Sequence, residues 1–173
     1  MGTAAPTPDD PEAWTAYLAE GNARQARKRV AVDLLIRDTG GRVLVVNPAY
    51  KPDWDLPGGM SEANEAPDDT ARRELREELG LDIVPCGLLV VEWVPPHGPW
   101  DDQLAFILDG GTISDAEMYS LRPHDAELIE VAMVSSHKAE RLLRARLVPR
   151  FRAAMRALEN KRPCLMRDGQ SLG

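Results

Sequence analysis

The sequence predicts an α/β domain with a mixed sheet, and three observations favour this fold class. Short apolar runs rich in β-branched residues alternate with amphipathic segments, which is typical of strands interleaved with helices. The segment 67–79 carries an apolar stripe at helical spacing and is followed by Gly80, a residue typical of helix ends. The length of 173 residues and the hydrophobic fraction of 43% are sufficient for one domain with a sizeable core.

A helix is expected near the N-terminus. The first ten residues are rich in Pro, Thr and Asp, and we expect them to fray. The helix should begin at Pro11, because Asp10 is a typical N-cap and proline is favoured at the first helical position. Gly21 should end it. Its apolar face consists of Trp14, Tyr17 and Leu18.

Two strands should follow this helix. The runs 30–36 and 43–46 are short, apolar and rich in β-branched residues, and a turn at 38–41 joins them. The loop after them is rich in Pro and Asp and ends in the sequence Trp-Asp-Leu-Pro-Gly-Gly at 54–59.

The central helix should begin at Pro67 and end at Gly80. Asp68 and Asp69 suit the positive end of its dipole. The stripe that we expect to be buried consists of Ala71, Leu75 and Leu79.

The C-terminal half predicts three more strands, over 83–94, 104–108 and 128–134. A proline-rich loop of the kind that shapes a pocket joins the first two. Two amphipathic helices follow, around 137–145 and 149–160. The chain thus divides into an N-terminal tail and helix, a central domain and a C-terminal tail, at 1–28, 29–160 and 161–173.

Charge and cysteine content restrict the class of protein. The net charge of −7 does not favour nucleic-acid binding. Cys86 and Cys164 lie far apart without metal-ligand spacing, which suits a reducing compartment, and Cys86 is expected in the core. No apolar run approaches the ~20 residues that span a membrane, and residues 1–6 match neither a signal peptide nor a myristoylation signal. We therefore expect a cytoplasmic protein without membrane contact.

Three carboxylates on the central helix are the strongest functional feature. Glu74, Glu77 and Glu78 are three and four residues apart, so they share a face and repel each other. A divalent cation such as Mg²⁺ prefers oxygen ligands and would turn this repulsion into a binding site. A solvated helix face is the ordinary explanation of such a cluster taken alone.

The 23 residues from Gly59 to Leu81 resemble the Nudix box, G-x5-E-x7-R-E-U-x-E-E-x-G-U, in which U is a bulky apolar residue. The defined positions are filled by Gly59, Glu65, Arg73, Glu74, Leu75, Glu77, Glu78, Gly80 and Leu81. Two departures are Asn64, where many members have glycine, and Ala66-Pro67, where many have a Ser or Thr helix cap. The resemblance implies an α/β/α sandwich with a central mixed β-sheet.

The resemblance also implies an activity, the Mg²⁺-dependent hydrolysis of a nucleoside diphosphate linked to another group, with Mn²⁺ as a possible substitute. The implied metal ligands are the carboxylates of Glu74, Glu77 and Glu78 and the backbone carbonyl of Gly59. Arg73 is expected to hold Glu65 in place, since arginine suits bidentate pairing with a carboxylate.

The general base is left open between a box glutamate and a carboxylate outside the box. Glu77, Glu78 and Glu127 are the catalytic candidates, and Glu127 stands just before the strand 128–134. Glu127 as an ordinary surface carboxylate is an equal alternative. Weaker candidates for the base are Asp101, Asp102 and Glu117.

Substrate choice depends on residues outside the box. Pro96 stands fifteen residues after Leu81, a spacing that resembles the proline of ADP-ribose-type members and favours a sugar nucleotide of that kind. A modified nucleoside triphosphate is the next choice. Trp93 and Trp100 could stack on a nucleobase, and packing in the core or at its rim is the alternative for both.

Two further alternatives stay open. A Nudix-type domain can sense nucleotides or regulate without catalysis, although the full set of glutamates favours an enzyme. The segment 138–162 carries nine Lys or Arg, for which a solvated helical face is favoured over RNA binding. A nucleotide is the expected small-molecule partner, and a homodimer is possible.

Overall fold

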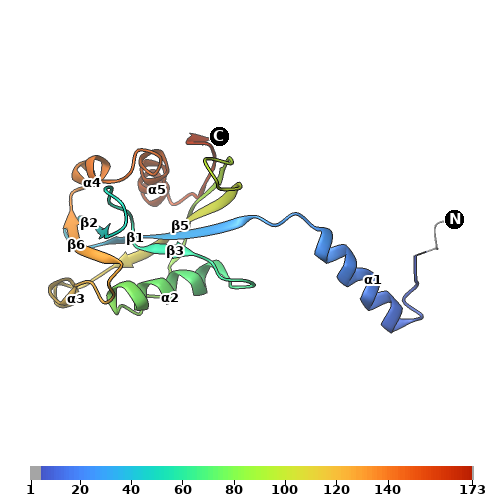
Figure 1. Ribbon diagram of the computed structural model, residues 1–173. Coiled ribbons are helices and arrows are strands. Elements are labelled where there is room, and N and C mark those ends of the chain that lie inside the picture. The colour runs from blue at the N-terminus through green and yellow to red at the C-terminus, as the bar shows by residue number, and fades with distance from the viewer. Residues whose placement is uncertain (1–4, 173) are drawn as a thin grey trace.

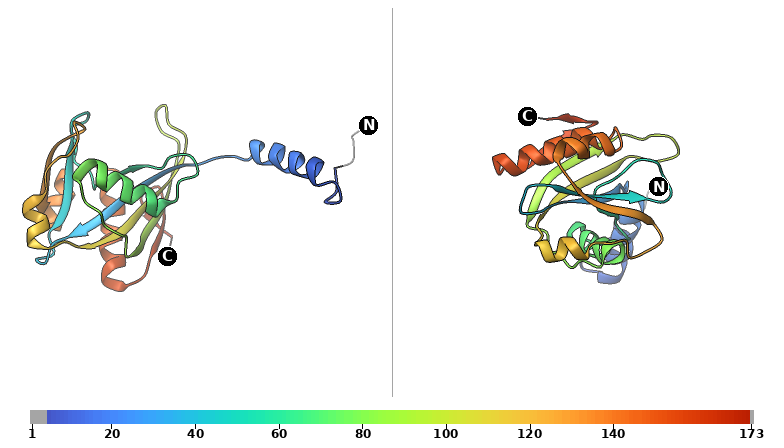
Figure 2. Two further views of the ribbon diagram at one scale, coloured as in Figure 1. Left: turned by 90° about the horizontal axis from the view of Figure 1, so that it is seen from below. Right: turned by 90° about the vertical axis from the view of Figure 1, so that its left-hand side faces the viewer.

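The computed structural model describes residues 5–172, which form a mixed sheet between two layers of helices (Figures 1 and 2). The strands lie in the order β6-β2-β1-β5-β4-β7-β8, and β3 pairs with β1 beside this path. The predicted sandwich is confirmed. The strands are β1 (Arg29–Arg37), β2 (Val43–Pro48), β3 (Gly58–Met60), β4 (Gly87–Val94), β5 (Gln103–Thr112), β6 (Leu128–Val134), β7 (Cys164–Arg167) and β8 (Gln170–Ser171). The helices are α1 (Pro11–Arg24), α2 (Pro67–Leu79), α3 (Asp115–Ser120), α4 (Ser136–Leu142) and α5 (Val148–Asn160).

The helices cover opposite faces of the sheet, α2 on one side and α4 with α5 on the other (Figure 1). Alternation along β1 separates the two cores, because successive side chains of a strand point to opposite faces. Under α2, the buried residues Val32, Leu34 and Ile36 of β1 pack in one cluster with Ala71, Leu75 and Leu79, the predicted stripe of the central helix. Leu35 belongs to the other cluster, together with Phe151 of α5.

One edge of β1 is shared by two strands, and this arrangement positions the site. β2 pairs with β1 at Arg37, whereas β3 pairs with it further back, where Asp33 lies opposite Gly58. The chain between β2 and β3 fills the gap, since Asp55 exchanges two backbone hydrogen bonds of 2.9 Å with Val46. The loop that precedes α2 is thereby fixed against the middle of the sheet.

The helix α1 extends away from the sheet and buries none of its residues (Figures 1 and 2). It begins at Pro11 with Asp10 as its N-cap, as the sequence predicts, but it continues past Gly21 to Arg24. Trp14 and Tyr17 stack on each other, with ring centroids 5.7 Å apart, instead of packing on the domain. Residues 1–4 and 173 of the expected tails lie outside the described residues.

The central helix has the predicted bounds. Pro67 is its first residue, Ala66 provides no side-chain cap, and Gly80 ends it in the left-handed conformation with φ of 66°. Left-handed backbone is accessible to glycine without a steric penalty. No helix within residues 5–172 has the length and apolar character needed to cross a membrane.

Several elements differ from the sequence expectations. β4 begins at Gly87 rather than at residue 83. Cys86 is exposed, so the expectation that it lies in the core is wrong. The short elements α3, β3, β7 and β8 were not expected. β7 and β8 lie within the stretch 161–173 expected as a tail, and β7 pairs with β4 in parallel. The division of the chain at 1–28, 29–160 and 161–173 stays a prediction.

Candidate functional site

Arg73 on α2 binds three of the glutamates that the sequence analysis singled out. Its Nε and Nη2 donate to the two carboxylate oxygens of Glu65 at 2.8 and 3.0 Å. Its Nη1 donates to Glu74 at 2.9 Å and to Glu77 at 3.0 Å, and Nη2 also reaches the Met60 carbonyl at 3.1 Å. This geometry agrees with a supporting role for Arg73, since all five of these contacts orient protein groups.

Glu65 is the anchor of this network. Besides Arg73, its carboxylate accepts hydrogen bonds from the Thr70 hydroxyl and from the Glu62 amide, both at 2.9 Å. The hydrogen bonds from Arg73, followed by the one from Glu62, lower the pKa of Glu65 to about 2. The side chain therefore stays ionised and holds the start of α2 against the loop before it.

Glu78 lies one helical turn after Glu74 on α2, and its carboxylate faces the loop that precedes this helix. The Gly58 amide donates to its carboxylate at 3.2 Å. The pKa of Glu78 is raised to about 8, chiefly by burial; the Gly58 hydrogen bond lowers it, and the charges of Glu74, Asp125 and Asp33 raise it. Burial likewise raises the pKa of Glu74, with smaller contributions from the charges of neighbouring glutamates. Two crowded carboxylates thus lie where their ionised forms are disfavoured.

Two glycines allow this close approach. At Gly59 a Cβ atom would lie 2.4 Å from the carboxylate carbon of Glu74. At Gly58, which has φ of 142°, a Cβ atom would lie 2.1 Å from the Val32 carbonyl oxygen. A side chain at 58 would clash with the backbone of β1, so glycine is required there, whereas a side chain at 59 would displace the carboxylate of Glu74.

The donor set fits a divalent cation. Within residues 5–172, no three acidic, histidine or cysteine side chains already stand in the geometry of a metal site, and Arg73 engages Glu74 and Glu77. The groups available are nevertheless all hard oxygen donors, which suit Mg²⁺ or Mn²⁺. A cation beside Glu74 and Glu78 would favour the ionised forms that burial and mutual repulsion disfavour.

Glu127 lies close to the glutamates of α2. Its charge is one of the causes that raise the pKa of Glu74. The loop before β6 is tied to α2, because the His124 amide donates to the Glu78 carbonyl at 2.8 Å. The same loop brings Asp125 near Glu78, and the sequence analysis did not select Asp125.

The tryptophans and proline predicted to contact substrate lie around the β4–β5 connection. Trp93 is half-buried, donates from its indole nitrogen to Asp102 at 2.7 Å and lies under the Arg167 guanidinium. Trp100 is 54% exposed and packs against Arg29. Pro96 is exposed beside them. Each tryptophan already contacts an arginine, and the predicted stacking on a nucleobase stays a prediction.

A second acidic group on the α5 side of the sheet escaped the sequence analysis. Asp33 of β1 is 6% exposed and Asp55 is 8% exposed. Arg150 lies 3.7 Å from Asp33, and Arg144 lies 3.1 Å from Asp55. The available signal was a charged residue inside the apolar run VAVDLLI, because a strand interior seldom carries an aspartate.

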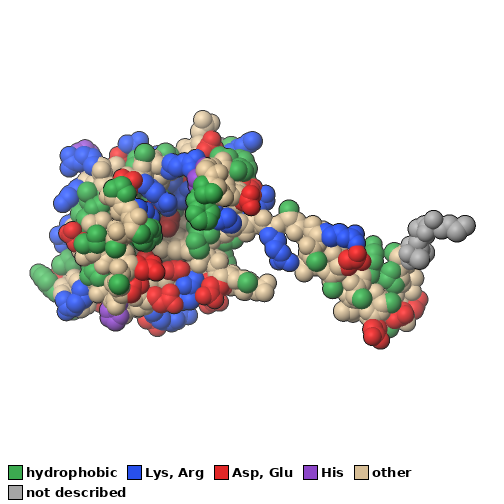
Figure 3. Space-filling model, in the orientation of Figure 1, with side chains coloured by type: hydrophobic (Ala, Val, Ile, Leu, Met, Phe, Trp, Pro, Cys, Tyr) green, Lys and Arg blue, Asp and Glu red, His purple; other side chains and the backbone are tan. Residues whose placement is uncertain are grey.

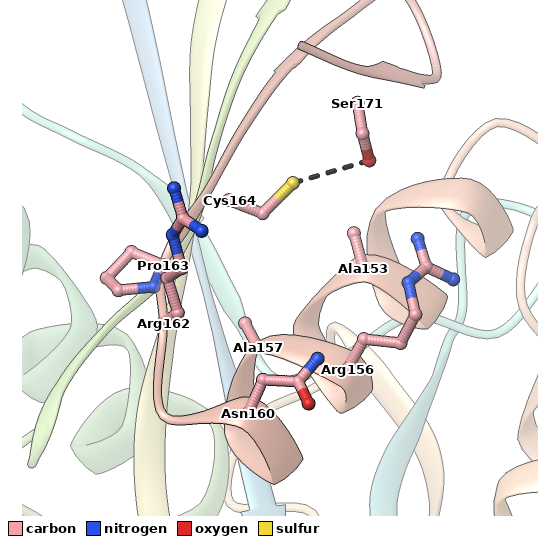
Figure 4. A pocket seen from close by; sticks show the side chains of 8 residues that line it. All are labelled: Ala153, Arg156, Ala157, Asn160, Arg162, Pro163, Cys164 and Ser171. Carbon is pink, nitrogen blue, oxygen red and sulfur yellow. Dashed lines mark hydrogen bonds between the residues drawn. The ribbon is translucent and has the colours of Figure 1, made fainter. Parts of the chain in front are cut away.

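A separate cavity of about 210 Å³ lies where α5 ends and β7 begins. Figure 4 shows Arg156 and Arg162 on opposite sides of it, with the Cys164 sulfur 3.4 Å from the Ser171 hydroxyl between them. None of the residues predicted for the site lines this cavity. It lies on the α5 side of the sheet, away from the glutamates of α2.

The chain is similar in sequence and in fold to known proteins. The model of the NUDIX domain family matches residues 27–158. The chain is 50% identical over 36 residues to an 8-oxo-dGTP diphosphatase of Proteus vulgaris, covering 21% of this chain and 32% of the relative. It is 43% identical over 53 residues to an RNA pyrophosphohydrolase of Halorhodospira halophila, covering 31% of this chain and 29% of the relative. The chain thus spans about a third of the length of these curated relatives.

Among solved structures, the MutT protein of Methanosarcina mazei Go1 has the same fold. It superposes with a TM-score of 0.64 at 26% sequence identity, covering 80% of this chain and 100% of that protein.

Proposed function

The chain belongs to the NUDIX domain family, and on this premise we propose that it is a Mg²⁺-dependent hydrolase of a phosphoanhydride bond in a nucleoside diphosphate derivative. The observation that carries the proposal is the close packing of Glu74 and Glu78 against Gly58 and Gly59. The ion pair between Arg73 and Glu65 holds the loop that contains these glycines to α2. This arrangement provides oxygen ligands at a position where backbone can approach a phosphate closely.

In this proposal the side chains of Glu74, Glu77 and Glu78 and the carbonyl of Gly59 hold the metal. The bound ion would neutralise phosphate charge and acidify a water molecule. Arg73 then keeps the glutamates oriented through the contacts described above. Glu77, Glu78 or Glu127 accepts the proton of the attacking water.

Two substrate classes are supported by different observations. The name of the Proteus vulgaris relative supports a modified nucleoside triphosphate, whereas the position of Pro96 supports an ADP-ribose-like sugar nucleotide. The alternative of a non-catalytic nucleotide sensor predicts binding without turnover. The cytoplasmic location rests on the cysteine content.

The proposal is tested with Glu78→Gln and a matched control, Glu159→Gln. Glu159 is an exposed carboxylate at the far end of α5. Turnover is measured with and without Mg²⁺ on nucleoside triphosphates, modified triphosphates and ADP-ribose. Glu78→Gln should lower kcat by several orders of magnitude with the circular dichroism spectrum unchanged, and the control should match the parent.

Activity of Glu78→Gln within tenfold of the parent would contradict the ligand assignment. Tight nucleotide binding by the parent without turnover of any substrate would instead support the sensor.

A further inference from the structure

The loop 121–127 joins α3 to β6 and passes the C-terminal end of α2 (Figure 1). The Glu78 carbonyl lies in the last turn of that helix, where carbonyls lack a partner within the helix. The His124 amide supplies this partner at 2.8 Å. The His124 ring lies over Gly80, since a Cβ atom at Gly80 would be only 2.8 Å from its Nε2. One residue of the loop thus covers the end of the helix that carries the candidate metal ligands.

Two hydrogen bonds extend this attachment from His124 to Glu127. The Glu127 amide donates to Asp125 Oδ1 at 2.9 Å, which closes a tight turn directly after His124. On the other side, the Ala49 amide of the β2 end donates to the Glu127 carbonyl at 2.7 Å. The backbone of Glu127 is therefore held at both its amide and its carbonyl.

The side chain of Glu127 is free, unlike those of the other two candidates for the general base. In the described part of the chain its carboxylate makes no hydrogen bond or ion pair. Glu77 is instead bound to Arg73, and Glu78 accepts a hydrogen bond from the loop before α2. A carboxylate without donors remains available to accept a proton.

Electrostatic repulsion acts against this position of the loop. Besides burial, the largest cause, the charge of Asp125 raises the pKa of Glu78. The charge of Glu127 adds in the same way to the effect of burial on Glu74. Figure 3 shows acidic side chains gathered around α2. None of the ion pairs within residues 5–172 joins this loop to the rest of the chain, so the contacts of His124 and the bond from β2 oppose the repulsion.

We propose that His124 is a positioning residue of the hydrolysis, which holds Glu127 where it accepts the proton of the attacking water. The inference rests on the proposed function and deepens it, because it selects Glu127 from the three candidates for the base. His124 acts through the packing of its ring on Gly80 and not through proton transfer. The ring fits there because position 80 has no side chain, and its left-handed backbone suits glycine.

Steady-state kinetics on the full chain test this role, with saturating Mg²⁺ and the nucleotide of the panel above that the parent hydrolyses fastest. His124→Ala should lower kcat by about tenfold or more and leave KM within about threefold, because a small displacement of a reacting group is costly. His124→Phe keeps a flat ring over Gly80, so its kcat should stay within about threefold of the parent. His137→Ala is the matched control, at an exposed site of α4 on the other side of the sheet, and should equal the parent.

A second background separates positioning from a general loss of structure. Because His124 acts through Glu127, His124→Ala should change kcat by less than about twofold in a Glu127→Gln protein, as expected of residues that act as one unit. Amide hydrogen exchange of the metal-free proteins, followed by mass spectrometry, provides a readout without catalysis. In His124→Ala the segment 121–127 should exchange about tenfold faster than in the parent, while β1 and β5 keep the parental rates.

The inference is overturned if His124→Ala keeps the parental kcat, or if its exchange over 121–127 is unchanged. A loss of kcat that is equally large in the Glu127→Gln background would show that His124 does not act through Glu127. A His124→Phe protein as impaired as His124→Ala would exclude packing as the cause. A parent that hydrolyses no nucleotide of the panel contradicts the proposed function, whereas full activity of His124→Ala contradicts this inference alone.

Discussion

Glu78→Gln should make the metal-free protein more stable at neutral pH, although it removes a residue central to the proposed activity. In the folded chain, burial and the neighbouring carboxylates disfavour the ionised form of Glu78. In the unfolded chain the same carboxyl group is solvated and ionises freely. A neutral glutamine keeps an oxygen for the Gly58 amide and removes the charge.

The magnitude follows from the difference in pKa between the two states. The pKa of Glu78 rises from 4.5 to about 8 on folding. Below pH 4.5 both states are protonated and Glu78 has no effect on the free energy of unfolding. As the pH rises to 7, folding loses about 3 kcal/mol, at 1.36 kcal/mol per unit, and the loss levels off above pH 8. Glu78→Gln removes this loss and should therefore raise Tm by roughly 6–12 °C, since 1 kcal/mol shifts Tm by ~2–4 °C at this size.

Thermal unfolding followed by circular dichroism in EDTA measures the effect, from pH 4.5 to 8.5. The Tm of Glu78→Gln should equal that of the parent at the acid end and exceed it increasingly towards pH 8. Added Mg²⁺ should raise the Tm of the parent more than that of the variant, because a ligand that binds the folded state stabilises it.

A variant that is no more stable than the parent at pH 8 in EDTA would refute the reasoning. It would mean that Glu78 is well solvated in the folded chain, and that carboxylate crowding does not prepare the site for a cation.

Three other substitutions test separate parts of the structure. Gly59→Ala should lower kcat/KM at least a hundredfold in steady-state assays, because its Cβ would lie 2.4 Å from the Glu74 carboxylate, while Gly87→Ala, which meets open space, should not. A lysine at position 73 cannot keep the bidentate bond to Glu65 together with the bonds to Glu74 and Glu77. Arg73→Lys should therefore lower Tm by about 3–6 °C and reduce kcat. An unchanged Tm would contradict the supporting role of Arg73. Phe151→Ala, in the core under α5, should lower the free energy of unfolding in urea by about 3–5 kcal/mol, whereas Tyr50→Ala, 70% exposed, should change it by less than about 0.5 kcal/mol.

The central helix could be predicted from sequence because its signals are local. Proline at its first position, acidic residues in its first turn and Gly80 at its end each act within a few residues of the boundary. The same reasoning failed at Gly21, because glycine ends a helix only where the chain turns to the left-handed conformation, and α1 instead continues to Arg24. The strands β3, β7 and β8 have two to four residues, too few for a periodic pattern.

The candidate site likewise contains contacts that could be predicted from sequence and contacts that could not. The pairing of Arg73 with Glu65 was expected from the resemblance of this segment to the Nudix box and from the ability of arginine to pair with a carboxylate, and the two side chains lie 2.8 Å apart in the structure. Asp33 and Asp55 belong to segments that meet through the β1–β3 pairing, the Leu34–Pro57 backbone hydrogen bond and the bridge between Val46 and Asp55. Contacts of this kind depend on the register between distant strands, and a single sequence gives no direct signal of that register.

The register of β1 therefore has a consequence beyond packing. A slip of one residue would turn Asp33 into the apolar layer beneath α2 and turn Leu34 towards Arg150 on the other face of the sheet. Antiparallel pairing with β3 along one edge and parallel pairing with β5 along the other prevent such a slip. The register of these two pairings thus decides on which face of the sheet the Asp33 carboxylate lies.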